Sequence, residues 1–287
     1  MFTPVQPNTA AWQPLTPRGV AAFAGASGRR LWLVQSLVAS ASAAVLLLIL
    51  ANHWFPGIRA AIRKLPERGR IYHGRLEWPD GSPQLLTDGT FLAISVDLDH
   101  SGGRRSPAHL QFEFGRTDLQ VHSLFGYYAS CPYPRTCDLP FNRPALEPWW
   151  GAWSPVLLGA VALLSVTGLL LCWSVLATLY APIVWLIGLY GGREPGLRGS
   201  WKLAGAALMP GAILEIAALA GYGLARLDPV PLLAATAAHF VVPWLYLFIG
   251  PLFLPRAASP TAIKGNPFVA GPANRRNEDQ EQPRRER

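Results

Sequence analysis

Long apolar runs alternate with one extended polar segment, and the apolar runs are long enough to cross a lipid bilayer. A helix that rises 1.5 Å per residue needs about 20 apolar residues to span ~30 Å of hydrocarbon. Four runs meet this length, at residues 31–52, 154–190, 203–225 and 232–254. The second run has no strong turn signal near its middle, so we expect one long helix that bends at Pro182. The pattern therefore predicts four membrane-spanning helices.

Positive charge at the ends of these runs predicts their orientation. Lys and Arg are enriched on the cytoplasmic side of membrane proteins. Here they concentrate in residues 1–30, in the loop after the second run and in residues 255–287. Four crossings place all three segments on one side, whereas a fifth would export the arginine-rich tail. We expect a multi-pass protein of a bacterial inner membrane, with both termini in the cytoplasm and residues 53–150 outside it.

Composition agrees with a membrane protein and narrows the partners. Hydrophobic residues make up 51% of the 287 residues and charged residues only 15%, which does not fit a conventional soluble enzyme. The net charge of +8 belongs mainly to the cytoplasmic flanks, so we expect contact with membrane lipid and no binding of nucleic acid. Residues 255–287 lack periodicity and are rich in Pro, Asn, Arg and Glu, which predicts a disordered tail.

The polar segment between the first two runs, residues 53–150, predicts a small α+β domain. Apolar residues recur at helical spacing over residues 55–65, which is typical of an amphipathic helix lying on the bilayer surface. Between residues 69 and 125 the period changes to two, most clearly in FLAISVDLD at 91–99. Residues 115–118 can turn the chain between two strands. We expect a small, mostly antiparallel sheet with one apolar face that needs a cover.

Two cysteines frame the sequence CPYPRTC in this segment. Cys131 and Cys137 lie six positions apart on the expected outer side, where the environment is oxidising. This spacing predicts a disulfide that closes a small loop, and the alternative is two free thiols in a proline-rich loop. Cys172 lies within an apolar run and is expected to be a small packing residue.

No motif in the polar segment predicts catalysis, a cofactor or a metal. The sequence DLDHSG, which begins at Asp97, matches the opening of a calcium-binding loop, but its twelfth position is Ala108 instead of Glu. We therefore expect a polar turn there. Four histidines, at positions 73, 100, 109 and 122, show no recognisable ligand spacing for zinc. We also find no HExxH, GxSxG or phosphate-binding glycine loop.

One polar pair lies inside the apolar runs. Glu215 lies near the middle of the third run, where a charged carboxylate costs roughly 2.5–3.5 kcal/mol. His239 of the fourth run is its candidate partner, because a tight hairpin brings the two residues to similar depths. The pair could bind a ligand or carry protons, or it could be a polar clasp that fixes the register of the hairpin. Small residues such as Gly205 and Gly211 predict close helix packing around it.

Part of the sequence resembles a known group of membrane proteins. The positions that carry the resemblance are Leu65, Pro66, Ile71, Gly74, Leu76, Pro83, Leu86, Gly89, the stretch FLAISVDLD, and the end of the second run at Tyr190, Gly191 and Gly192. They resemble uncharacterised bacterial integral membrane proteins that have an external β-rich loop and a Yip-like helical bundle. The resemblance implies this architecture and a membrane location. It implies no activity and no catalytic residues.

Taken together, these patterns predict an α+β membrane protein with a four-span helical bundle and one small extracytoplasmic β-domain. The leading functional hypothesis is a non-enzymatic protein whose β-domain binds an envelope protein, a lipid or another envelope component. The alternative is a small transporter or proton-coupled membrane component that uses Glu215 and His239. A membrane-bound enzyme comes third, because nucleophile and metal motifs are missing.

Overall fold

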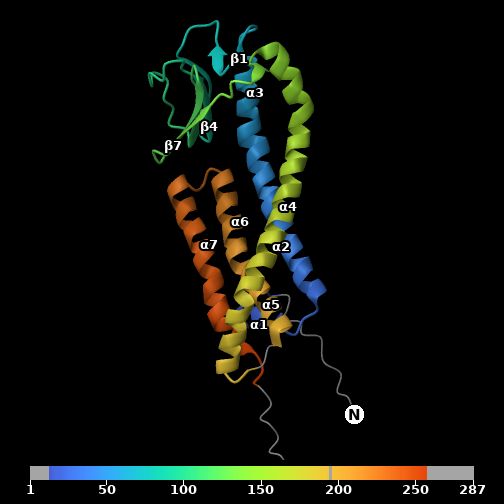
Figure 1. Ribbon diagram of the computed structural model, residues 1–287. Coiled ribbons are helices and arrows are strands. Elements are labelled where there is room, and N and C mark those ends of the chain that lie inside the picture. The colour runs from blue at the N-terminus through green and yellow to red at the C-terminus, as the bar shows by residue number, and fades with distance from the viewer. Residues whose placement is uncertain (1–12, 194–195, 257–287) are drawn as a thin grey trace, which may run out of the picture.

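The computed structural model describes residues 13–193 and 196–256, which form a helical bundle with a β-domain at one end (Figure 1). The predicted disordered tail, residues 255–287, lies almost wholly outside the described residues, as do residues 1–12. Four helical segments are long and apolar enough to cross a membrane. This finding confirms the number of long apolar helices that the sequence predicts.

The first two of these segments are longer than the apolar runs predict. Helix α2 (Gly28–Ile49) continues through a π-helical turn (Leu50–Trp54) directly into α3 (Phe55–Arg63). Helix α4 (Arg143–Tyr190) is one helix of 48 residues, which confirms that residues 154–190 form a single helix. At 1.5 Å per residue α4 is about 72 Å long, more than twice the thickness of a bilayer core. Its first turns therefore rise beside the β-domain (Figure 1).

The third segment is broken and central, and the fourth packs closely against it. Helix α5 (Gly196–Ala207) ends before Leu208. Helix α6 (Met209–Gly223) has Pro210 in its first turn, and the missing N–H of Pro210 interrupts the hydrogen-bond ladder. Helix α7 (Pro229–Ile249) then runs back beside α6 and ends in a 3₁₀ turn (Gly250–Phe253). A Cβ atom on Gly211 would lie 2.7 Å from the His239 carbonyl oxygen, so the close approach of α6 and α7 requires glycine there.

The N-terminal segment is part of the bundle, although the sequence predicts only a cytoplasmic extension. Helix α1 (Pro17–Ala22) begins at Thr16, whose hydroxyl accepts a hydrogen bond from the Gly19 N–H at 3.0 Å. Val20 and Phe23 are fully buried in the core that α2, α4 and α5 form. The apolar run at residues 20–24 is too short to span a bilayer, so run length alone does not predict its place in the core.

The β-domain contains two sheets instead of the single sheet expected at residues 69–125. The five-stranded sheet has the order β3 (Gln84–Asp88), β4 (Leu92–Val96), β5 (Leu110–Phe114), β6 (Asp118–Ser123) and β7 (Tyr128–Pro132). Only β4 and β5 pair in parallel, so the sheet is mostly antiparallel as predicted. The second sheet has the order β2 (Arg75–Glu77), β1 (Arg70–Tyr72) and β8 (Asp138–Pro140). The sequence therefore predicts β4, β5 and the β5–β6 hairpin correctly but misses β3, β7 and β8.

Helix α3 covers the apolar face of the larger sheet. Ala61 and Ile62 on α3 are buried in one cluster with Leu92 and Ile94 of β4, and Trp150 of α4 closes the cluster. The predicted amphipathic helix at 55–65 is therefore present, but its apolar face packs on the sheet and does not face lipid. The reason is that α2 continues through the π-helical turn into α3 with no loop between them, so α3 extends towards the sheet (Figure 1).

The predicted disulfide between Cys131 and Cys137 is not formed. Both cysteines are free thiols, as is Cys172. Cys131 lies on β7 opposite Leu119, whereas Cys137 leads into β8 of the other sheet. Tyr133, between them, donates its backbone N–H to Thr117 and its hydroxyl to Gly115. These bonds hold the connecting segment between the two sheets, so the spacing in the sequence does not bring the sulfur atoms together.

Candidate functional site

The face of the larger sheet that points away from α3 is polar and buried. Alternation along β4, β5 and β6 places Ser95, Gln111, Glu113 and Gln120 on this face. All four are buried, and the Glu113 side chain is only 1% exposed. The connection between the parallel strands β4 and β5 covers them. Gln111 donates to the Arg104 carbonyl oxygen at 3.0 Å and accepts from the Ser106 N–H at 2.9 Å.

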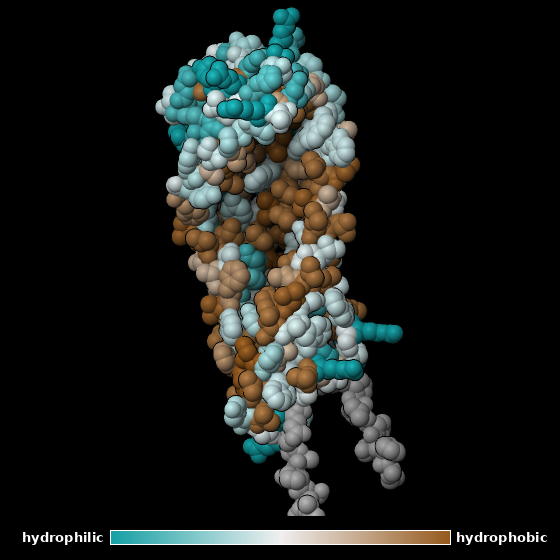
Figure 2. Space-filling model, in the orientation of Figure 1, coloured by the Kyte–Doolittle hydropathy of each residue, from teal (hydrophilic) through white to brown (hydrophobic). Residues whose placement is uncertain are grey.

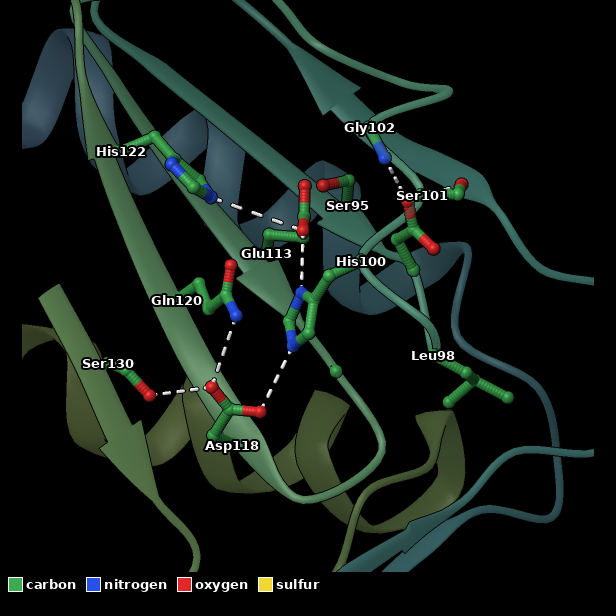
Figure 3. Close-up of polar contacts among 12 residues, drawn as sticks. Ser95, Leu98, His100, Ser101, Gly102, Glu113, Asp118, Gln120, His122 and Ser130 are labelled. Carbon is green, nitrogen blue, oxygen red and sulfur yellow. Dashed lines mark hydrogen bonds and ion pairs between the residues drawn. The ribbon is translucent and has the colours of Figure 1, made fainter. Parts of the chain in front are cut away.

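His100 joins two carboxylates at the centre of this cluster (Figure 3). Its Nδ1 lies 2.7 Å from Glu113 Oε1, and its Nε2 lies 3.0 Å from Asp118 Oδ1. The other oxygen of Asp118 accepts hydrogen bonds from Ser130 at 2.6 Å and from Gln120 at 3.2 Å. His122 lies on the far side of Glu113, with Nε2 at 4.0 Å from Oε1. The doubly protonated ring of His100 can donate to both carboxylates at once.

Hydrogen bonds in the turn after Asp97 position His100 between its two carboxylate partners. The Asp97 carboxylate accepts from the Ser101 hydroxyl at 2.9 Å and the Gly102 N–H at 3.0 Å, which confirms the predicted polar turn. His100 itself adopts a positive φ of 50°. Gly115 lies directly beneath the ring, because a Cβ atom there would approach His100 Nε2 to 2.1 Å. Turn, backbone conformation and glycine therefore fix the ring between its partners.

The pKa values in the cluster follow from these contacts. Burial lowers the pKa of His100, but its hydrogen bonds to Glu113 and Asp118 outweigh burial and raise that pKa above its ordinary value. Burial also raises the pKa of Asp118, yet the hydrogen bonds from Ser130, His100 and Gln120 bring it below its usual range. The pKa of His122 is lowered by burial and then by the charge of Arg105. His100 is therefore the histidine of this cluster that favours its charged form.

This arrangement holds the β4–β5 connection on the polar face of the sheet. The carboxylates of Glu113 and Asp118 are occupied by neighbouring side chains. Within residues 13–193 and 196–256, no group of three or more His, Cys, Asp or Glu side chains is placed to hold a metal ion. The four histidines show no ligand spacing in the sequence, but the structure brings His100 and His122 together around Glu113. The polar alternation on β5 and β6 was the signal that could have revealed this.

The β-domain docks on the end of α6 through aromatic and histidine side chains. His109 Nδ1 lies 2.8 Å from the Tyr222 hydroxyl, and the Phe91 ring meets the Tyr222 ring edge-on at 5.0 Å. His53, in the π-helical turn, donates to the Gly223 carbonyl oxygen at 2.6 Å. These contacts hold the sheet directly above the α6–α7 hairpin (Figure 1).

Below this junction, Glu215 and His239 line a cavity between α2, α4, α6 and α7. Glu215 Oε1 accepts a hydrogen bond from Thr236 on α7 at 3.0 Å, so the bond across the hairpin goes to the residue one turn before His239. Glu215 Oε2 and His239 Nδ1 are buried and have no hydrogen-bond partner among the described residues. The cavity has a volume of ≈ 430 Å³ and is otherwise mostly apolar. Figure 2 shows the hollowed, largely hydrophobic face between the helices.

A second, open groove lies on the β-domain, near the three-stranded sheet. Its volume is ≈ 900 Å³, and both Arg75 and Asp138 line it. Trp78 also lines the groove, and its indole nitrogen is buried without a hydrogen-bond partner among the described residues. The groove therefore mixes charged side chains with an aromatic wall.

Comparison with known proteins identifies no relative: no family model, no curated protein and no solved structure matches this chain. The resemblance to membrane proteins with a Yip-like bundle stays a prediction.

We predict that His100→Ala loosens the β-domain because it leaves the buried Glu113 carboxylate without its closest partner. The local free energy of opening should fall by about 2–3 kcal/mol, as expected when one member of a buried, hydrogen-bonded charge pair is removed. Hydrogen exchange of the β5 and β6 amides in the full-length protein measures this loss. The double variant His100→Ala with Glu113→Gln should recover part of it, because no charge remains unpaired. Equal exchange in the wild-type and His100→Ala proteins would contradict the proposed role.

The stability that His100 contributes, measured as the difference between the wild-type protein and His100→Ala, should depend on pH. A histidine whose pKa is raised on folding stabilises the folded state fully below its unfolded pKa of about 6.5. This contribution is lost as the pH rises through the raised pKa of His100. The stability difference between the wild-type protein and His100→Ala should therefore be largest in mildly acidic buffer and shrink in alkaline buffer. A difference that is constant from pH 5 to pH 9 would show that His100 acts by packing alone.

Proposed function

We propose that this chain is a multi-pass membrane protein in which the four apolar helical segments cross the bilayer and the β-domain lies on one side. The exposed surface of the helices supports this proposal. Leu163, Leu164 and Leu171 on α4, and Phe240 on α7, are each more than 60% exposed. An apolar surface of this extent is unfavourable in water and favourable in lipid. The basic flanks described above support a cytoplasmic location for both termini and a bacterial inner membrane.

Within that membrane, the protein binds a hydrophobic molecule in the cavity at Glu215 and His239. The observation that carries this function is that two buried polar atoms without partners, Glu215 Oε2 and His239 Nδ1, border the same cavity. An unpaired buried polar group costs about 1–3 kcal/mol, and a ligand that pairs with it recovers that free energy. The volume of ≈ 430 Å³ also falls within the range typical of small-molecule sites.

The chemistry of the cavity wall defines the class of ligand. Leu46, Leu169 and Trp173 supply apolar contacts, and the acid and the imidazole supply two hydrogen-bonding groups. A matching ligand has an apolar body and one polar group able to both donate and accept, such as a hydroxyl. The same site would serve a small transporter or a proton-coupled component if the bound molecule or a proton moved through it. In either case Glu215 is a ligand-contacting residue and no catalytic residue is required.

A second candidate function is recognition of an envelope partner by the β-domain. The ≈ 900 Å³ groove, with its aromatic wall at Trp78, supports this hypothesis. Crosslinking in native membranes, followed by identification of the captured protein, tests it directly. The cavity ranks first because two unpaired polar atoms, from an acid and an imidazole, border it, whereas the groove has one, the indole nitrogen of Trp78.

We predict that Gly168→Leu blocks the cavity and removes the bound molecule. Gly168 lines the cavity, and a Cβ atom there meets nothing within 4 Å, so the new side chain can enter the space without a clash. Mass spectrometry of hydrophobic molecules that co-purify with the protein measures occupancy.

Loss of one hydrogen bond in Glu215→Gln should weaken retention of the bound molecule by about 2- to 10-fold, while the protein stays folded.

Gly159→Leu is the matched control, because Gly159 is also on α4 with nothing within 4 Å but does not line this cavity. It should retain the same molecules as the wild-type protein. Equal retention by the Gly168→Leu and wild-type proteins would refute the proposed site. Captured envelope protein together with an empty cavity would favour the second candidate function.

The membrane topology gives a further prediction. A reporter fused to the C-terminus should be active only in the cytoplasm, because an even number of crossings returns the chain to the side of its N-terminus. A reporter inserted after Gly81, in the exposed connection between β2 and β3, should be active only outside the cytoplasm. Activity of both reporters on the same side would be incompatible with four crossings.

A further inference from the structure

The turn between β6 and β7 is an exposed apolar loop without charge. Its sequence is LFGYY, at residues 124–128, and no Asp, Glu, Lys or Arg occurs between Asp118 and Arg135. Leu124, Phe125, Tyr127 and Tyr128 are 51–65% exposed, although large apolar side chains are usually buried. The turn itself is well defined, since Ser123 donates to Tyr127 and Gly126 adopts φ +79°. A rigid turn that presents four large apolar side chains to the outside needs an explanation.

The position of the turn supplies that explanation. Phe125 and Ser123 share a small pocket with Pro229, Leu232 and Leu233 at the start of α7. The Leu124 N–H also donates to the carbonyl oxygen of His109, whose ring contacts Tyr222 at the end of α6. The turn therefore lies beside the end of the α6–α7 hairpin and not on the distal part of the domain (Figure 1).

The lengths of the helices place this end of the hairpin at the surface of the bilayer. The segment Pro229–Phe253 has 25 residues and is about 37 Å long, a few ångströms more than the ~30 Å hydrocarbon core. Leu232 and Leu233 are about 5 Å below the first residue of α7, near the boundary between headgroups and hydrocarbon. Arg226 and Asp228, in the connection before α7, mark the aqueous side. Phe125 is therefore level with the lipid interface.

We infer that the β6–β7 turn inserts into the outer leaflet and is a second membrane anchor of the β-domain. Aromatic side chains, Tyr among them, are enriched at this depth because their rings prefer the interface between headgroups and hydrocarbon. Exposed Leu224, Val230 and Leu233 of the hairpin continue the same apolar band. The occupant of this surface is lipid. The inference rests on the proposed membrane location but is independent of the cavity ligand.

Spin labels on single cysteines test the inference in the full-length protein reconstituted in lipid nanodiscs. The free cysteines at 131, 137 and 172 are first replaced by Ser. One label replaces Tyr127, and a second variant at Phe125 covers the case in which the first does not fold. Collision with oxygen, which concentrates in lipid, is compared with collision with a water-soluble nickel complex. We expect the label at Tyr127 to collide more often with oxygen than with the nickel complex.

Two reference positions separate the possible failures. A label at Phe240→Cys, on the exposed face of α7, should give the strongest lipid signature, which is high collision with oxygen and low collision with nickel. A label at Gly81→Cys should give a water signature, which is the reverse. A lipid signature at Phe240 with a water signature at Tyr127 would overturn the anchor and leave the membrane location intact. A water signature at Phe240 would overturn the membrane location itself. Low collision with both reagents at Tyr127 would mean that a protein partner or second copy covers the turn, which also refutes the inference.

Discussion

The architecture depends on two helices that extend beyond the thickness of a bilayer. The helix from Gly28 to Arg63 has 36 residues and α4 has 48, which corresponds to about 54 and 72 Å. Because neither helix is interrupted by a flexible linker, their ends reach the sheet as packed elements, with α3 on its apolar face and Trp150 beside it. The β-domain is thereby carried by the bundle and is held over α6 and α7 by the contacts at Tyr222 and Gly223.

The two buried faces of the larger sheet differ in polarity. One face is apolar and packs on α3, whereas the other buries Glu113, Gln111 and Gln120 beneath the β4–β5 connection. A buried carboxylate is costly unless it is paired, and His100 supplies the pairing. The loop and the cluster therefore depend on each other: the loop excludes water from the polar face, and the polar face fixes the loop.

The bundle contains the opposite situation, in which the polar groups are only partly paired. Thr236 satisfies one oxygen of Glu215, but the second oxygen and His239 Nδ1 border an apolar cavity. Buried polar atoms without a partner are rare in native structures, and a bound ligand that pairs with them is one explanation. In the His100 cluster both carboxylates have hydrogen-bond partners, and this contrast is why we propose binding at the cavity and structural support at the cluster.

The sequence by itself determined the elements whose pattern is local: four long apolar helices, the strands around Leu92–Val96 and Leu110–Phe114, the polar turn after Asp97 and the polar residue Glu215. These follow from residue spacing and from the free energy of burial. Tertiary structure decided what spacing cannot reveal. It separated Cys131 from Cys137 by placing them beside different sheets, paired Glu215 with Thr236 instead of His239, and brought His100, Glu113 and Asp118 together. Those outcomes depend on strand order and helix register, which arise from contacts between residues far apart along the chain.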